Sequence, residues 1–242
     1  MPEPMYPPIT AEEELMPVAD PAGRRSAGRP PRVTREAIAE AALRLGPDRA
    51  TLMTIGRALG VDHSTLYRHV KGRDDLMSAA VDRALDGVGW QRGAAEDWRA
   101  YLVRVSETVW DLYERYPGVA ETIRALEATP PSVVHAFAAM CDELAGAGFS
   151  GSDAMLVVDS IMDMTNDSAV GWRRLAGASA NGTTVAEAMR RSWEAEFAAE
   201  GTGNSVAAAM AGVIAGEPRH WWRRKLDLLL DGAAGLLARK SG

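Results

Sequence analysis

Seven residues between positions 63 and 71 carry side chains that can form hydrogen bonds with DNA base edges or neutralise phosphates. Between them, Leu66 and Val70 are four residues apart, so both lie on one face of a helix and leave the polar side chains on the opposite face. This pattern predicts a helix that enters the major groove of double-stranded DNA. The residues expected to contact DNA from this segment are His63, Ser64, Thr65, Tyr67, Arg68, His69 and Lys71.

Three short helices followed by a longer one are expected to position this segment. Thr34 is a suitable N-cap for the first helix, which a Gly-Pro pair at residues 46–47 ends. Thr51 caps a second helix that ends at Gly60, where glycine permits the left-handed backbone of a tight turn. Asp62 caps the third helix, which presents Leu66 and Val70 inward. This order of elements is typical of a helix-turn-helix.

The charge distribution agrees with DNA binding although the whole chain has a net charge of −6. Residues 24–73 contain eleven basic and four acidic residues, whereas residues 1–23 and 74–242 are both acidic. Only the segment that contacts DNA has to neutralise phosphates, so a basic segment can bind DNA even though the rest of the protein is acidic.

The first 32 residues contain eight of the thirteen prolines and are expected to be disordered. Their basic end is either a solvated linker or an arm that follows phosphates or enters a minor groove. The DNA contacts expected outside residues 63–71 come from Arg29, Arg32 and Thr51.

The segment from Thr54 to Leu76 resembles the DNA-binding core of the TetR family of transcriptional regulators. The strongest agreement lies in Gly60-Val61, in residues 65–71 (Thr-Leu-Tyr-Arg-His-Val-Lys) and in Leu76. By this resemblance, four residues match positions that commonly touch DNA: Thr65, Tyr67, His69 and Lys71. Two other interpretations stay open: Tyr67 packs in the core, or His69 is a solvated surface residue. Many relatives have an arginine where this chain has Met53, so either that phosphate contact is missing or Arg49 and Arg57 compensate for it.

The resemblance, together with helical apolar spacing throughout, implies an all-α fold of two domains after the N-terminal extension. Residues 33–78 would form the DNA-binding domain, and residues 79–242 a ligand-binding and dimerisation domain. A homodimer is expected because one helix-turn-helix rarely gives tight specific binding, and two would read a pseudo-palindrome about one DNA turn apart. The residues expected at the dimer interface are Met155, Trp222, Leu226, Leu229, Leu230, Ala233 and Leu237. The alternative for the apolar residues of the helix expected from residue 219 to about residue 239 is that they form an ordinary monomeric core.

A pocket for a small-molecule effector of unknown identity is also implied by the resemblance. Its expected lining residues are Trp110, Tyr113, His135, Met140, Met162, Asn166 and Trp172. Asp159, Asp163 and Asp167 form a stripe that is interpreted as a solvated face, with attraction of a cationic ligand as the alternative. The single cysteine, Cys141, is expected to be a packed core thiol, with a reactive sensor as the alternative.

These features predict a cytoplasmic DNA-binding regulator, most simply a repressor that a small molecule releases from its operator. The alternatives are a ligand-independent activator or architectural protein and, with less support, a helical enzyme that acts on a small molecule. Four histidines and one cysteine offer little catalytic apparatus, and no spacing indicates a metal site or a cofactor. No run of apolar residues is long enough to span a membrane.

Overall fold

The structure is a computed structural model that describes residues 33–198 and 205–240. By its internal contacts the chain divides into two units, residues 1–32 and Val33–Gly242, and only the second is described here. The expected disordered extension, with Arg29 and Arg32, lies outside the described residues.

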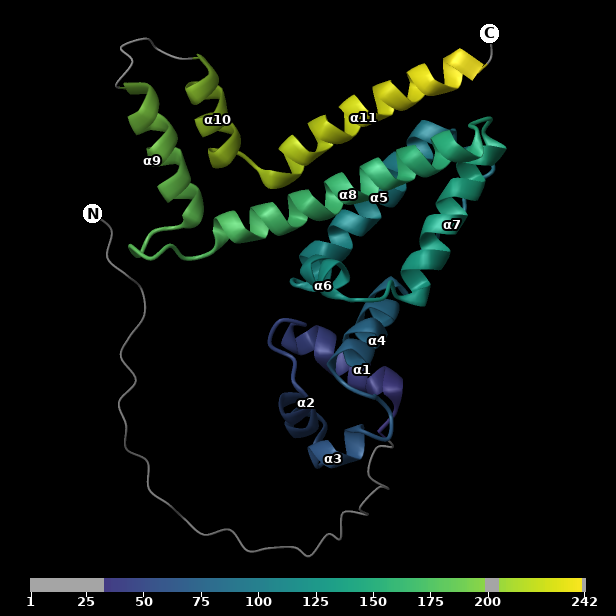
Figure 1. The fold of residues 1–242 in the computed structure, drawn as a ribbon, viewed down its shortest axis with the longest axis vertical. Coiled ribbons are helices and arrows are strands. Elements are labelled where there is room, and N and C mark those ends of the chain that lie inside the picture. Colours follow the sequence, from purple (N-terminus) through teal and green to yellow (C-terminus); the bar gives the residue numbers. More distant parts are fainter. Residues whose placement is uncertain (1–32, 199–204, 241–242) are drawn as a thin grey trace, which may run out of the picture. The chain divides into compact units, whose positions relative to one another are not determined.

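The described residues form an all-α fold, as expected, with no strand and a single isolated β-bridge between Ala178 and Thr184 (Figure 1). The helices are α1 (Arg35–Leu45), α2 (Leu52–Leu59), α3 (His63–Leu66), α4 (Arg73–Leu85), α5 (Trp98–Arg115), α6 (Val119–Ala125), α7 (Pro131–Gly146), α8 (Gly151–Ala176), α9 (Val185–Ala198), α10 (Ser205–Ala215) and α11 (Pro218–Lys240).

The first core holds α1 to α4 together. Ile38 of α1, Ile55 of α2, Leu66 of α3 and Leu76 of α4 are each at most 1% exposed and belong to one cluster. Helix α4 packs mainly on α1 and also contacts α6 and α7, so it runs through the expected domain boundary at residue 78 without a break. The α1–α4 group therefore shares α4 with the rest of the unit.

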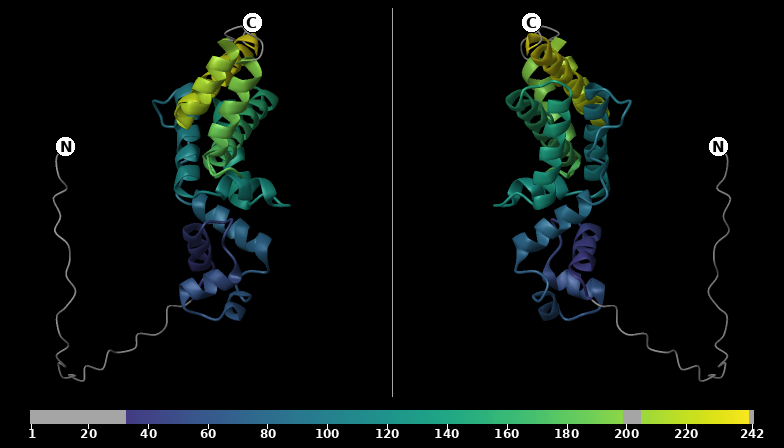
Figure 2. Two further views of the ribbon diagram at one scale, coloured as in Figure 1. Left: turned by 90° about the vertical axis from the view of Figure 1, so that its left-hand side faces the viewer. Right: turned by 90° about the vertical axis from the view of Figure 1, so that its right-hand side faces the viewer.

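The second core lies among α5, α7, α8 and α11. Helices α8 and α11 run side by side (Figures 1 and 2). Trp222 of α11 is fully buried, stacks on Trp110 of α5 with ring centroids 4.7 Å apart, and donates from Nε1 to Thr165 Oγ1 of α8 at 3.1 Å. Such an indole fixes three helices at once, because its apolar body fills the core while its N–H is satisfied.

Helices α9 and α10 form a hairpin that contacts α8 mainly through α9. Thr184 and Glu187 form the expected capping box at the start of α9, with two reciprocal bonds of 3.1 Å. Among the described residues, no helix is both long enough and apolar enough to cross a membrane.

Candidate functional site

The polar segment predicted to contact DNA is held by two buried anchors. Leu66 is fully buried and Val70 is 1% exposed, whereas Tyr67 between them is 59% exposed. His63, Ser64, Arg68 and Lys71 are exposed, and Thr65 and His69 are half-buried. Tyr67 is therefore not a core residue, which removes one of the two alternatives for this segment.

Helix α3 covers only the first part of this segment. After Leu66 the chain forms a turn in which the N–H groups of His69 and Val70 both donate to the Leu66 carbonyl, at 2.8 and 3.0 Å. Asp62 caps the helix as expected, its Oδ1 accepting from the Ser64 N–H at 2.8 Å. The polar side chains thus extend from a short helix and the turn that follows it.

Two glycines make the close approach of α2 and α3. Gly60 has φ of 68°, the left-handed conformation expected from the sequence. Gly56 was not anticipated: a Cβ there would lie 2.9 Å from the Val61 carbonyl oxygen and 3.2 Å from the His63 backbone nitrogen. Its position inside a helix gave no sequence signal, because the need for glycine comes from the chain that crosses it.

Asp75 at the start of α4 links three parts of the α1–α4 group, and sequence reasoning missed it. Its carboxylate accepts from Arg35 of α1 at 2.5 Å and from the Lys71 N–H at 2.7 Å. Arg35 also donates to the His69 carbonyl at 2.9 Å. The hydrogen bonds from Arg35, followed by that from the Lys71 backbone, hold the pKa of Asp75 near 2, below its ordinary value of 3.8. Together these bonds fix the end of the polar segment against α1.

Thr51 and Met53 lie at the start of α2. Thr51 and Thr54 form a capping box, with bonds of 2.9 and 3.1 Å between each backbone N–H and the other hydroxyl. Thr51 is exposed, and Met53 is 62% exposed. Arg49 and Arg57, which would replace the missing arginine, are exposed as well.

A pocket of about 240 Å³ opens between α5, α6 and α8, and three expected lining residues meet there: Trp110, Tyr113 and Trp172. We call it the Tyr113 pocket. Asn166 supports it from behind, donating from Nδ2 to the Tyr113 hydroxyl at 3.3 Å and to the Ala120 carbonyl at 3.2 Å. Burial raises the pKa of the Tyr113 phenol above its ordinary value.

The other three expected lining residues do not line this pocket. His135 is exposed on α7, Met140 is 3% exposed in the second core, and Met162 packs at the edge of that core. Met140 and Met162 pack within their own chain, which apolar residues at helical spacing do more often than they line a cavity, whereas His135 faces away from both the core and this pocket. Cys141 is half-buried at the edge of the same core, and burial raises the pKa of its thiol.

Arg173 forms a wall of the Tyr113 pocket and connects it to the α1–α4 group. Its guanidinium donates to Asp48 in the α1–α2 loop and to Glu121 of α6, both at 2.9 Å. Glu121 also lines the pocket. Arg173 therefore links the lining of the Tyr113 pocket to the loop that precedes α2. Arg173 is 52 positions from Glu121 and 125 positions from Asp48 in the sequence, so no local sequence pattern could have predicted these contacts.

The aspartate stripe of α8 is exposed at Asp159, Asp163 and Asp167, as a solvated face requires. Asp167 forms an ion pair with Arg124 of α6. In the part of the chain that the structure describes, no group of three His, Cys, Asp or Glu side chains could hold a metal ion.

The residues expected at a dimer interface fall into two sets. Four of them lie in the core of a single chain, where a partner cannot reach them: Trp222, Leu226, Leu230 and Ala233, each at most 2% exposed. Leu229 and Leu237 pack at the edge of this core. Met155 is 55% exposed, and so are two residues that the sequence reasoning missed, Leu156 at 53% and Leu228 at 73%. The apolar stripe of α11 faces its own chain, and the surface available to a partner is a different one.

No protein-family profile and no curated protein matches the chain. Among solved structures, a possible TetR family transcriptional regulator from Streptomyces coelicolor is similar over 84% of this chain and 99% of its own, with a TM-score of 0.70 and 23% identity. ActR from the same organism, in complex with actinorhodin, covers 84% of this chain and 98% of its own, at a TM-score of 0.65 and 15% identity. TetR from Acinetobacter baumannii covers 87% of this chain and 100% of its own, at a TM-score of 0.60 and 16% identity.

The chain has the TetR-family fold. The similarity spans nearly the full length of each of these structures, so it includes the α5–α11 part, for which the sequence offered only an architectural resemblance. The polar segment lies in the α1–α4 group, and the Tyr113 pocket lies among α5, α6 and α8. The hydrogen bond from Arg173 to Asp48 connects these two parts.

Proposed function

We propose that this protein is a dimeric DNA-binding transcriptional regulator, a repressor that a small molecule releases from a pseudo-palindromic operator. The observation that carries the proposal is the polar face of residues 63–71, which is exposed while its two anchors are buried. Major-groove reading needs side chains of this chemistry on a rigid support, and the Asp75 bonds, the Gly60 turn and the close crossing at Gly56 provide that support.

In this proposal Tyr67 and Lys71 bind phosphates, while His63, Ser64 and Thr65 at the start of α3 face base edges. Arg68 and His69 lie in the same exposed segment and can reach either. Thr51 at the start of α2 contacts the backbone beside them. All these contacts are available in one chain, and a second chain doubles them across a two-fold axis.

The dimer surface that best fits the structure is the outward face of α8 and α11. Three large apolar side chains on this face are each more than half exposed: Met155, Leu156 and Leu228. Helices α8 and α11 pack side by side, so their outward faces can pair with the same two helices of a second chain.

Leu228→Arg should therefore yield monomers that keep their fold, because the side chain is 73% exposed and no core contact is lost. Leu229→Arg would be less informative, since Leu229 packs at the edge of the second core. Val134→Arg is the matched control: Val134 is 50% exposed on α7 and should leave the dimer intact. Sedimentation velocity gives the result, and a dimeric Leu228→Arg protein would contradict this interface.

The Tyr113 pocket is the proposed effector site. Its walls combine aromatic side chains with a phenol donor and with Arg173 and Glu121, a mixture suited to a small organic molecule with a few polar groups. ActR, which shares the fold, binds actinorhodin in its complex, and this supports an organic effector here. Competition of the ligand for Arg173 or Glu121 would disturb the bond to Asp48 and change how α1–α4 is held.

The deciding experiment is selection of bound DNA from a random-sequence duplex pool by the purified full chain. A pseudo-palindrome with half-sites about one helical turn apart is expected. Recovery of no motif, with only salt-sensitive binding, would instead favour an architectural protein and would overturn the repressor proposal.

A further inference from the structure

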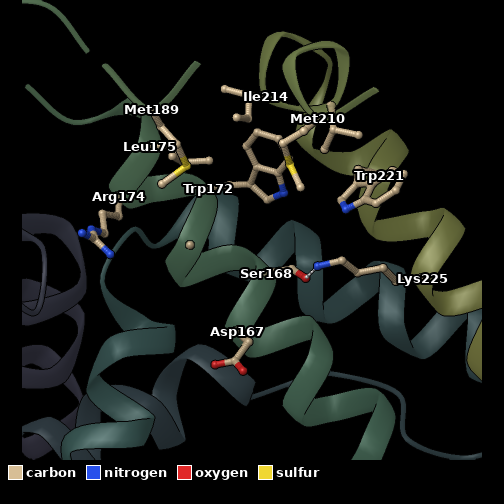
Figure 3. Close-up of a pocket in the computed structure, with 12 residues that line it drawn as sticks. Asp167, Ser168, Trp172, Arg174, Leu175, Met189, Met210, Ile214, Trp221 and Lys225 are labelled. Atoms are coloured by element: carbon tan, nitrogen blue, oxygen red, sulfur yellow. Dashed lines mark hydrogen bonds between the residues drawn. The ribbon is translucent and has the colours of Figure 1, made fainter. Parts of the chain in front are cut away.

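A second pocket, of about 280 Å³, lies on the far side of Trp172 from the Tyr113 pocket, since that indole lines both. We call it the Lys225 pocket. The last turns of α8 and the first turns of α11 form its base, and residues of α9 and α10 complete it (Figure 3). The α9–α10 hairpin contacts α8 mainly through α9, so α10 covers this space without filling it.

The walls of the Lys225 pocket are mainly apolar and include two flat indole rings. In Figure 3 the Trp172 indole rises between Met189 and Leu175 on one side and Met210 and Trp221 on the other. Indole rings favour flat ligands, which they contact over a whole face, and methionine side chains adapt to ligand shape. The volume lies just below the usual range for small-molecule sites and suits about two fused rings.

The base of the pocket carries an uncompensated positive charge. The Lys225 ammonium points to the Ser168 hydroxyl at 3.3 Å, a neutral partner, and forms no ion pair within the described part of the chain. The carboxylate on the lining, Asp167, is paired with Arg124 and points away from Lys225. Arg174 adds a second cation at the rim.

We propose that the Lys225 pocket binds a flat aromatic anion, such as an aromatic carboxylate or sulfonate of about two rings. The rings lie against Trp172 and Trp221, and the anionic group replaces or joins Ser168 at the Lys225 ammonium. A half-buried ammonium gains more from an anion than from a hydroxyl, because charge-assisted hydrogen bonds are about twice as strong as neutral ones. This site is separate from the proposed effector site, and its existence does not depend on DNA binding.

Two dyes of similar shape, one anionic and one neutral, test the proposal on the purified full chain. The probe is naphthalene-2-sulfonate, an anion, and its neutral counterpart is naphthalene-2-sulfonamide; both are fluorescent. Lys225→Met should weaken binding of the sulfonate about tenfold, the loss of one charge-assisted contact. The affinity for the neutral dye should change less than twofold. Equal affinity of the sulfonate for both proteins would overturn the proposal.

Three further variants locate the dyes. Gly171 lines the Lys225 pocket, and a Cβ there meets nothing within 4 Å, so Gly171→Leu should fill the space and abolish binding of both dyes. Gly151→Leu, on the same helix and equally open, is the matched control and should bind both. Ala169 lines only the Tyr113 pocket, so Ala169→Leu should also leave binding unchanged.

Other occupants give different results. If Ala169→Leu blocks the sulfonate and Gly171→Leu does not, the dye binds in the Tyr113 pocket and the proposal fails. If a second copy of the chain fills the Lys225 pocket, only the Leu228→Arg monomer will bind the dyes, which also overturns it. None of these readouts involves DNA, so a failure here leaves the proposed regulator function to its own test.

Discussion

The two ends of this fold satisfy their polar and apolar groups in opposite ways. In α1–α4 most large apolar side chains are buried, with Met53 as an exception, and the exposed side chains of residues 63–71 are mainly polar. Around α8–α11 large apolar side chains stay exposed, and two pockets remain open beside Trp172. A surface that must meet DNA presents charge and hydrogen bonds on a rigid support, whereas surfaces that meet a second chain or a flat ligand leave apolar area uncovered.

The rigidity of the α1–α4 group depends most on the crossing of α2 and α3. Gly56→Ala should lower the free energy of unfolding by about 1–3 kcal/mol, because its Cβ would press on backbone atoms that cannot move aside. Denaturant unfolding measures this value. Gly146→Ala at the end of α7 is the control: its Cβ meets open space, and its effect should be near zero. Equal effects of the two substitutions would show that the crossing tolerates a side chain.

Exposed side chains of residues 63–71 can be substituted to weaken DNA binding without disturbing the buried core. Lys71→Ala and Tyr67→Phe should each weaken binding to any DNA sequence about tenfold, since phosphate contacts carry little sequence information. Lys71→Ala should also reduce the salt dependence of binding, whereas Arg191→Ala, an exposed position on α9, should change neither. Unchanged affinity of both DNA-face variants would contradict the assignment of these contacts.

The α1–α4 group is also where the sequence was most informative. Its helices, caps and buried stripe depend on neighbours a few residues away, so Thr34, Thr51, Asp62 and Gly60 could be read directly. Gly56 and Asp75 could not, because Val61 and Arg35 reach them only in the folded chain.

Around α8–α11 the sequence predicted the helices better than their faces. The apolar stripe through Trp222, Leu226 and Leu230 was attributed to a dimer interface, but it fills the chain's own core. A periodic apolar stripe shows only that one face is covered and does not say by what. The same limit explains Met140, and Lys225 was overlooked because its isolation depends on which acids pair elsewhere.

The Asp75 junction predicts a pH dependence for the α1–α4 group. The pKa of the Asp75 carboxyl is lower in the folded chain than its ordinary value of 3.8. The bond from Arg35 to this carboxylate therefore stabilises the fold above about pH 4. This contribution should be lost as the pH falls from about 4 toward 2. With both side chains partly exposed, we expect about 1 kcal/mol, measured as the acid-side decline in unfolding free energy.

Asp75→Asn should remove that decline and lower the stability at neutral pH by the same amount. Asp74→Asn, one residue earlier and exposed, changes the charge of the same helix end without touching Arg35. An identical acid profile for wild type and Asp75→Asn would contradict the role of the junction.

The smallest expected effect concerns the contact that joins the two regions. A double-mutant cycle of Asp48→Asn and Arg173→Gln should give a coupling of about 0.5–1 kcal/mol in unfolding free energy, the range of a partly exposed ion pair. Arg99→Gln is the comparison, because Arg99 pairs with Asp231 of α11 at 2.8 Å and does not touch α1–α4. Both arginine variants should cost similar stability, yet only Arg173→Gln should change the affinity for DNA, by a few-fold. If Arg99→Gln changes that affinity as much, the connection between pocket and DNA surface does not pass through Arg173, and packing of α4 against α6 and α7 would have to carry it.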